Sequence, residues 1–140
     1  MKIETYLNYN GNCQEAFRFY EKHLGGKISF LMTYGEMPMP PGTPNPHPGM
    51  EKSILHLSFD IAGTRIMACD QPPPHDKPIQ GAWICIKPGS VAEVERIYQV
   101  LSDGAEIVMK LDQTFFAEKF AMLRDRFGTP WMIIHERPMS

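Results

Sequence analysis

The sequence predicts an α+β fold built from two βαβββ modules, because two different segments recur along its 140 residues. Residues 60–67 (DIAGTRIM) and 125–132 (DRFGTPWM) share Asp, Gly, Thr and Met at an offset of 65 (125 − 60). A helical pattern recurs at an offset of 78, which pairs Glu15 with Glu93 (93 − 15). The proline-rich stretch 71–78 separates the copies, so we expect module 1 at about residues 1–70 and module 2 at about 80–137.

The composition is that of an ordinary globular protein. Hydrophobic residues make up 43% of the chain, and a single domain spanning residues 1–140 is expected. The net charge of −2 comes from intermixed signs, which favours no nucleic-acid partner. No apolar run reaches the roughly 18 residues of a membrane span, and no signal-peptide pattern opens the chain. Three cysteines at unrelated spacings are expected to be reduced thiols in a cytoplasmic protein.

Module 1 is expected to begin with a strand and a helix. Residues 2–9 alternate in the manner of a strand, and one face carries Ile3, Thr5, Leu7 and Tyr9. Asn12 is expected to cap the helix, because Glu15 follows three positions later as in a capping box. The apolar stripe of this helix is Cys13, Ala16, Phe17, Tyr20 and Leu24. Gly25 and Gly26 end the helix, and residues 27–34 form the second strand.

A long loop and a hairpin complete module 1. Residues 35–51 are rich in proline, and a loop of this length is typical of a lid or a binding segment. Residues 52–59 and 64–70 form two strands around Ala62 and Gly63. If the turn has an even number of residues, the face that packs on the helix carries Leu55, Leu57, Phe59, Ile66 and Ala68. The opposite face then carries His56, Ser58, Arg65, Met67 and Cys69.

Module 2 repeats this order. It is expected to contain a strand at residues 82–87, a helix capped by Ser90, a strand at 106–110 and a hairpin at 116–136. The apolar positions of the helix are Val91, Val94, Ile97, Tyr98 and Leu101. Because neither module closes its own sheet, two four-stranded sheets with their helices outside would leave a cleft between them. Loop 35–51 is the expected lid of that cleft.

Four stretches carry a family resemblance: YLNYNGNCQEAF at 6–17, YGEMP at 34–38, QTFF at 113–116 and DRFGTPWMI at 125–133. Together with the paired modules, they resemble the vicinal oxygen chelate superfamily, which includes glyoxalase I, bleomycin-resistance proteins and extradiol dioxygenases. Within it, the chain closely resembles the PhnB-like group. That group is often labelled a 3-demethylubiquinone-9 3-methyltransferase, but no glycine-rich strand-to-helix loop is present here to hold S-adenosylmethionine.

The resemblance also implies where a metal would bind. Enzymes of the superfamily usually hold a divalent metal in the cleft, through ligands on the first and fourth strands of each module. In this sequence those positions fall on Thr5, Trp83, Met67 and Met132. A register slip of one brings in Ala82 or Trp131, and none of these side chains is an imidazole or a carboxylate, so no metal and no cofactor is expected. The resemblance further implies a homodimer, since single-domain members typically assemble in pairs.

Eight residues are the candidates for ligand binding in the predicted cleft: His56, Met67, Trp83, Gln113, Phe116, Met132, Glu36 and Thr5. His56 is either a ligand-binding or acid–base group or a strand histidine bonded to a neighbour. Gln113 and Phe116 orient a ligand or simply begin a strand. Glu36 is either a pocket carboxylate or a turn residue. The two methionines line an adaptable pocket or fill a core.

Three further interpretations concern neighbouring residues. Trp131, which follows Pro130, is expected in the core. His47 and His75 lie in the two proline-rich segments, and with His56 they would form a metal site if both segments fold over the cleft. Cys69 shares the predicted face of His56 and would act with it as a nucleophile, although nothing in the sequence supplies a third, orienting group.

The function that these features predict is metal-independent binding of a small, partly apolar molecule in the inter-module cleft. The first alternative is an enzyme of the vicinal oxygen chelate type that depends on His56 or on a metal recruited through the loop histidines. The second is a structural dimer whose pocket is closed by side chains. An accessible cavity would favour binding, and a filled cleft would favour the structural role.

Overall fold

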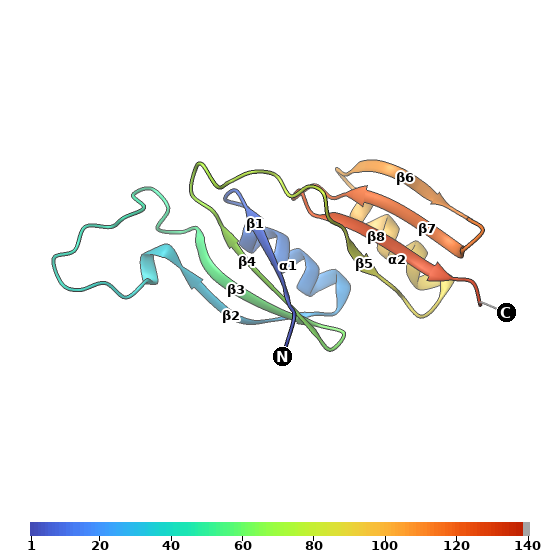
Figure 1. The fold of residues 1–140 in the computed structure, drawn as a ribbon, viewed down its shortest axis with the longest axis horizontal. Coiled ribbons are helices and arrows are strands. Elements are labelled where there is room, and N and C mark those ends of the chain that lie inside the picture. Colours follow the sequence, from blue (N-terminus) through green and yellow to red (C-terminus); the bar gives the residue numbers. More distant parts are fainter. Residues whose placement is uncertain (139–140) are drawn as a thin grey trace. The chain divides into compact units, whose positions relative to one another are not determined.

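The computed structural model describes residues 1–138 and forms two compact units, unit 1 (Met1–Pro78) and unit 2 (from Ile79 onward). Each unit has one α-helix and a four-stranded mixed sheet (Figure 1). Both follow the order strand, helix and three strands, so the predicted α+β fold with two βαβββ modules is confirmed. Within the described residues, no helix is both long and apolar enough to cross a bilayer.

Unit 1 contains β1 (Thr5–Tyr9), α1 (Cys13–Leu24), β2 (Lys27–Thr33), β3 (Ile54–Ile61) and β4 (Thr64–Asp70). A 3₁₀ helix (Tyr34–Glu36) follows β2. The strand order in the sheet is β1-β4-β3-β2. β1 pairs with β4 in parallel, and the other two pairs are antiparallel. Helix α1 packs its apolar stripe on one sheet face, where Phe17 contacts Tyr9 and Phe59 at ring-centroid distances of 5.7 and 5.2 Å.

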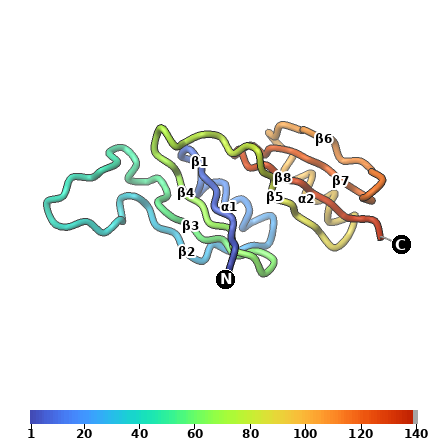
Figure 2. Tube along the Cα trace, viewed as in Figure 1, coloured from blue at the N-terminus to red at the C-terminus, as the bar shows by residue number. Residues whose placement is uncertain are grey.

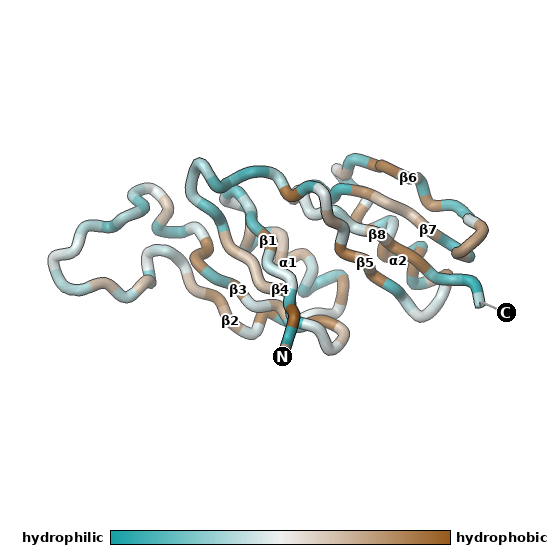
Figure 3. The backbone as a smooth tube through the Cα atoms, viewed as in Figure 1, coloured by the Kyte–Doolittle hydropathy of each residue, from teal (hydrophilic) through white to brown (hydrophobic). Residues whose placement is uncertain are grey.

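Unit 2 contains β5 (Ile84–Ile86), α2 (Val91–Ser102), β6 (Glu106–Asp112), β7 (Ala117–Arg124) and β8 (Pro130–Glu136). Its sheet has the equivalent order β5-β8-β7-β6, with β5 parallel to β8. The buried positions of α2 are Val94, Ile97 and Leu101, which belong to the predicted stripe. The backbone coloured by hydropathy shows apolar residues concentrated along α2 and β8 (Figure 3).

The two helices begin in different ways. Ser90 caps α2 as predicted, because its side chain accepts a hydrogen bond from the backbone N–H of Glu93. The prediction for Asn12 was wrong, since its side chain makes no capping hydrogen bond. The buried carboxylate of Asp70 takes that role from the end of β4, accepting hydrogen bonds from the backbone N–H groups of Gly11 and Cys13. A long-range contact has therefore replaced the local cap.

The two hairpins differ in their turns. Ala62 and Gly63 form the two-residue turn between β3 and β4, both with positive φ (50° and 75°), as tight hairpin turns require. The even count confirms the predicted division of faces. In unit 2, Arg124 pairs with Pro130, so five residues form the turn. The buried carboxylate of Asp125 organises it by accepting hydrogen bonds from two backbone N–H groups of the turn and from the Trp131 indole at 2.8 Å. Trp131 is buried, as predicted.

The long loop of unit 1 is closed at its base and runs outward. The backbone N–H of Tyr34 donates to Ser53 and that of Gly35 donates to Glu51, both at 3.0 Å. The Glu51 carboxylate accepts hydrogen bonds from Asn45 and Gly49 inside the loop. Figure 2 shows the loop extending past the ends of β2 and β3. Its predicted role as a lid stays a prediction.

Candidate functional site

The unit 1 sheet has one face covered by α1 and one face that no helix or strand of residues 1–78 covers, here called the open face. Side chains alternate across a strand, and Tyr9 and Phe59 point to α1, so their neighbours point away from it. The strand pairings Tyr6–Met67, Met67–Ser58 and Ser58–Phe30 define one row across this face. The open face therefore consists of Tyr6, Asn8, Phe30, Met32, His56, Ser58, Met67 and Cys69.

His56 lies at the centre of a polar chain on the open face. Its Nδ1 lies 3.2 Å from the Tyr6 hydroxyl, and its Nε2 lies 3.4 Å from the Ser58 hydroxyl. A neutral imidazole donates through one nitrogen and accepts through the other, so either tautomer satisfies both contacts. The sequence left open whether His56 is functional or merely bonded to a neighbour. The structure shows the hydrogen bonds, and such a chain is able to relay a proton or to orient a ligand.

A second polar group lies beside this chain. The Cys69 thiol donates to Asn8 Oδ1 at 3.7 Å, and the Gln71 amide donates to the same oxygen at 3.4 Å. Burial raises the pKa of the Cys69 thiol, and a nearby Asp70 carboxylate adds to that effect. A nucleophilic cysteine needs a lowered pKa, so the Cys69–His56 nucleophile has no support in this structure. Burial, followed by the contact with Cys69, raises the pKa of Tyr6, and both groups hold their protons at neutral pH.

Among the other unit 1 candidates, Met67 shares the open face with His56, whereas Thr5 and Glu36 lie elsewhere. By strand alternation, Thr5 shares its sheet face with Leu7 and Tyr9, the face that α1 covers. The hydroxyl and the backbone N–H of Thr33 donate hydrogen bonds to the Glu36 carboxylate and lower its pKa, so Glu36 completes a capping box at the 3₁₀ helix. A role of Glu36 in ligand binding stays a prediction. His47 packs on the Tyr34 ring at 5.0 Å. Met67 lies on the open face, as predicted.

Trp83 does not occupy the position that the sequence assigned to it. In unit 1, Tyr6 pairs with Met67, and in unit 2, Met132 pairs with Cys85. The first strands therefore correspond at an offset of 79 (85 − 6) instead of 78. The cause is a shorter connection to the helix: six positions separate Leu7 from Cys13, but five separate Ile86 from Val91. Trp83 precedes β5 and lies outside the strand.

The remaining candidates belong to unit 2. Met132 and Met122 pack against a buried apolar cluster of Ala117, Phe120 and Ile134. The Phe116 ring lies edge-on to Phe120 at 5.1 Å, at one end of this cluster. Gln113 is exposed, and its backbone N–H donates to Asp112. Met132 thus packs, partly buried, against an apolar cluster of its own unit, and a role of these three residues in ligand binding stays a prediction.

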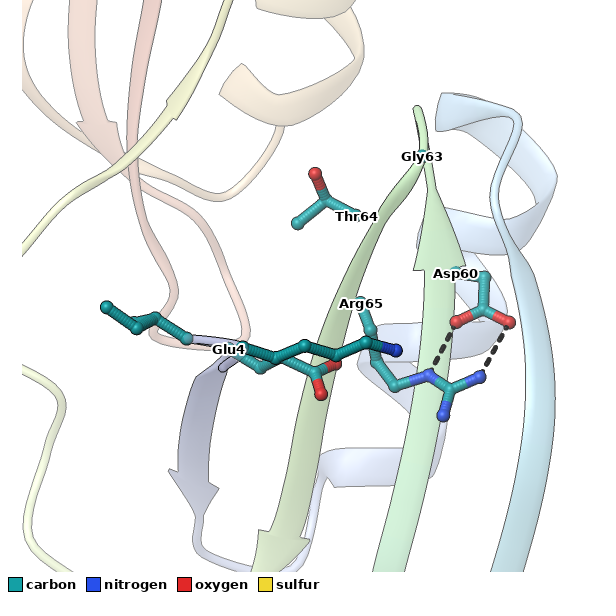
Figure 4. A pocket seen from close by; sticks show the side chains of 7 residues that line it. Glu4, Asp60, Gly63, Thr64 and Arg65 are labelled. Carbon is teal, nitrogen blue, oxygen red and sulfur yellow. Dashed lines mark hydrogen bonds and ion pairs between the residues drawn. The ribbon is translucent and has the colours of Figure 1, made fainter.

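A hollow of about 540 Å³ opens at the hairpin end of unit 1 (Figure 4). Its lining residues are Lys2, Ile3, Glu4, Asp60, Gly63, Thr64 and Arg65. The Arg65 guanidinium points to Asp60 and donates two hydrogen bonds to its carboxylate, at 2.8 and 3.3 Å. Asp60 and Arg65 are a cross-strand pair that continues the open face beyond Ser58 and Met67. Two acidic and two basic side chains balance in this hollow, so it has no strong preference for either charge.

The groups present do not fit the superfamily's metal site. The corrected first- and fourth-strand pairs are Tyr6 with Met67 and Cys85 with Met132. A phenol, a thiol and two thioethers are a poor donor set for the hard divalent cations, which take carboxylates and imidazoles. Among residues 1–138, no three His, Cys, Asp or Glu side chains are grouped to hold a metal ion. A site combining His47, His56 and His75 is therefore not formed.

The chain matches the Glyoxalase/Bleomycin resistance protein/Dioxygenase superfamily over residues 2–133. It therefore belongs to that superfamily, whose fold is the one described above. The sequence is 32% identical to Protein YjdN from Escherichia coli (strain K12) over 138 residues, which cover 95% of this chain and 94% of YjdN. The predicted membership is confirmed.

Solved structures agree with this assignment. Protein PA1353 from Pseudomonas aeruginosa superimposes with a TM-score of 0.87 at 34% identity, covering 99% of each chain. A PhnB protein from Bacillus cereus, described as a putative 3-demethylubiquinone-9 3-methyltransferase, superimposes with a TM-score of 0.81 at 24% identity. This match covers 96% of the present chain and 99% of the other, and at that identity it shows the shared fold. The predicted likeness to the PhnB-like group is thus supported at the level of the fold.

Several polar residues on or beside the open face were not among the candidates from the sequence. Tyr6, Asn8 and Ser58 lie on the face, and Gln71 donates a hydrogen bond to Asn8 from just beyond β4. Tyr6 and Asn8 follow from Thr5 and Leu7 by alternation once α1 is known to cover the latter pair. The contact between Asn8 and Cys69 depends on the parallel register of β1 and β4, for which no local pattern exists.

Proposed function

We propose that this protein binds a small, partly apolar molecule on the open face of the unit 1 sheet, without a metal ion. The observation that carries this proposal is His56, hydrogen-bonded on both sides by Tyr6 and Ser58. Phe30 and Met67 flank this chain with apolar surface. Ligand sites commonly combine apolar walls with a few fixed polar groups, which is the chemistry of this face.

The polar groups on this face are held in place before any ligand arrives. His56 is held by its two hydroxyl neighbours, and Asn8 receives hydrogen bonds from Cys69 and Gln71. Groups fixed in advance lose little conformational entropy on binding, which favours affinity. A hydroxyl or carbonyl group of the ligand would form hydrogen bonds with Tyr6 or His56. The apolar part of the ligand would cover the flanking side chains of Phe30 and Met67.

A second candidate function is acid–base catalysis by His56. The specific observation in its favour is the same two-sided hydrogen bonding, because a general acid or base needs a partner that fixes its orientation. Ser58 is only 6% exposed, so its hydroxyl serves to position His56. An enzyme would convert a bound compound over time, whereas a binding protein would return it unchanged. NMR spectra of the compound after prolonged incubation distinguish the two.

The proposal is tested by titrating two uncharged probes, 2-naphthol and decahydro-2-naphthol, into the ¹⁵N-labelled protein. We expect saturable amide shifts in β1, β3 and β4 with at least one probe. His56→Leu should weaken that binding about tenfold, because one hydrogen bond of roughly 1.4 kcal/mol is lost. The exposed His75 supplies the matched control, and His75→Leu should leave binding unchanged. Absence of saturable shifts with both probes would overturn the proposed function.

A further inference from the structure

Three rings form a row across the open face. The Tyr6 ring on β1 lies 5.7 Å from the His56 ring on β3, with an interplanar angle of 32°. The Phe30 ring on β2 lies 5.8 Å from the same imidazole, at 50°. The row is held by the sheet, because Ser58, two residues from His56, pairs with both Phe30 and Met67, and Met67 pairs with Tyr6. Three strands therefore supply one ring each to an aromatic platform, here defined as Tyr6, His56 and Phe30.

Two of the three platform rings are about half exposed. Tyr6 is 45% exposed and Phe30 is 46% exposed, whereas Phe17 and Phe59, beneath α1, are each 1% exposed. Tyr6 and Phe30 each direct apolar ring surface away from the core. Exposed aromatic surface beside fixed polar groups is characteristic of a binding site. Flat rings are matched best by another flat ring, which gains offset-stacked or edge-on contacts.

The surroundings of the platform carry little uncompensated charge. Tyr6 and Cys69 hold their protons, because burial raises the pKa of each. Towards the hairpin turn, the next cross-strand pair is Asp60 with Arg65, and these two charges neutralise each other. A charged ligand would lose hydration on this face without gaining an opposite charge. An uncharged ligand avoids that cost.

We propose that the aromatic platform binds an uncharged, planar aromatic compound whose hydroxyl or carbonyl group exchanges hydrogen bonds with Tyr6 and His56. This inference rests on the proposed function and narrows it to one chemical class of ligand. The ring system lies over the platform, with Phe30 as a purely apolar wall. The Tyr6 and Phe30 rings are tilted by 32° and 50° from the plane of the His56 ring. A flat ligand would therefore contact the faces of some rings and the edges of others, and would not stack on all three at once.

The test compares matched probes by amide-shift titration. Naphthalene rings are planar, and 2-naphthol should bind at least fivefold more tightly than decahydro-2-naphthol, its saturated and non-planar counterpart. The anion 2-naphthoate and the cation 2-naphthylmethylammonium should both bind more weakly than 2-naphthol. Phe30→Leu, which removes a ring without removing a hydrogen bond, should weaken 2-naphthol about three- to tenfold and leave decahydro-2-naphthol nearly unchanged.

A matched control and the opposing outcomes complete the test. Phe115→Leu removes a 93% exposed ring from unit 2 and should leave all titrations unchanged. Phe30→Tyr keeps a ring and should retain 2-naphthol binding. Equal affinities for the planar and saturated probes would overturn the aromatic inference while the proposed function stands. Tighter binding of either charged probe would overturn the uncharged class. Absence of binding by both neutral probes would overturn the inference and the proposed function together.

Discussion

The Asp70 carboxylate, at the last position of β4, accepts a hydrogen bond from the backbone N–H of Cys13, the first residue of α1, at 3.1 Å. The same side chain accepts from Gly11 at 2.8 Å and, through its other oxygen, from Ile54 at 2.8 Å. Its backbone carbonyl also accepts the Tyr34 hydroxyl at 2.7 Å. One residue that is 1% exposed therefore joins a helix start, two strands and the base of the long loop.

Replacing Asp70 with Asn should destabilise unit 1. The amide keeps one acceptor oxygen but turns an NH₂ group towards a backbone N–H, which leaves a buried donor without a partner. Hydrogen bonds to charged groups contribute roughly 1.5–3 kcal/mol, so the free energy of unfolding should fall by about that amount in urea titrations. Asp60→Asn is the matched control, and its change should be much smaller because the Asp60–Arg65 pair is exposed. Equal losses in the two variants would contradict the role assigned to Asp70.

Gly26 should not tolerate a methyl group. A Cβ atom built there would lie 2.2 Å from Cζ and 2.5 Å from Cε2 of the Phe59 ring, far inside van der Waals contact. Because Phe59 is buried against Phe17, the ring has little room to move. Gly26→Ala should therefore cost about 1–3 kcal/mol, measured as a loss in the free energy of unfolding.

Two further variants isolate the cause at Gly26. Gly89→Ala adds the same methyl group where no atom lies within 4 Å, and it should be close to neutral. Phe59→Leu removes the obstructing ring, so the double variant should lose less stability than the sum of its two single variants. Strict additivity of the two losses would show that the ring is not the obstacle.

Much of the fold could be predicted from local sequence patterns, because the residues that define a strand, a helix or a tight turn lie close together in the sequence. The alternation of residues 54–61 and 64–70, with a two-residue turn, placed His56 and Met67 on one face. Tyr6 and Asn8 could be assigned to the same face only once the structure showed that α1 covers Leu7 and Tyr9. Long-range effects account for the errors. Asp70 accepts the hydrogen bond of the Cys13 backbone N–H from 57 positions further along the chain, in place of a cap by Asn12. A connection to the helix that is one residue shorter moved Trp83 out of register.

Cys13 should make stability fall at alkaline pH. Burial first, and then the nearby Asp70 carboxylate, raise the pKa of this thiol above its usual 9.0. Above pH 9 the unfolded chain loses the Cys13 proton while the folded chain keeps it, so the folded state binds more protons and becomes less stable as pH rises. The slope from this thiol rises towards its limit of about 1.4 kcal/mol per pH unit as the unfolded chain becomes fully deprotonated. Cys13→Ala should remove that contribution between pH 9 and 10, as measured by urea titration at each pH. If the variant and the parent protein show the same slope, Cys13 ionises in the folded state and its burial does not control the pH dependence.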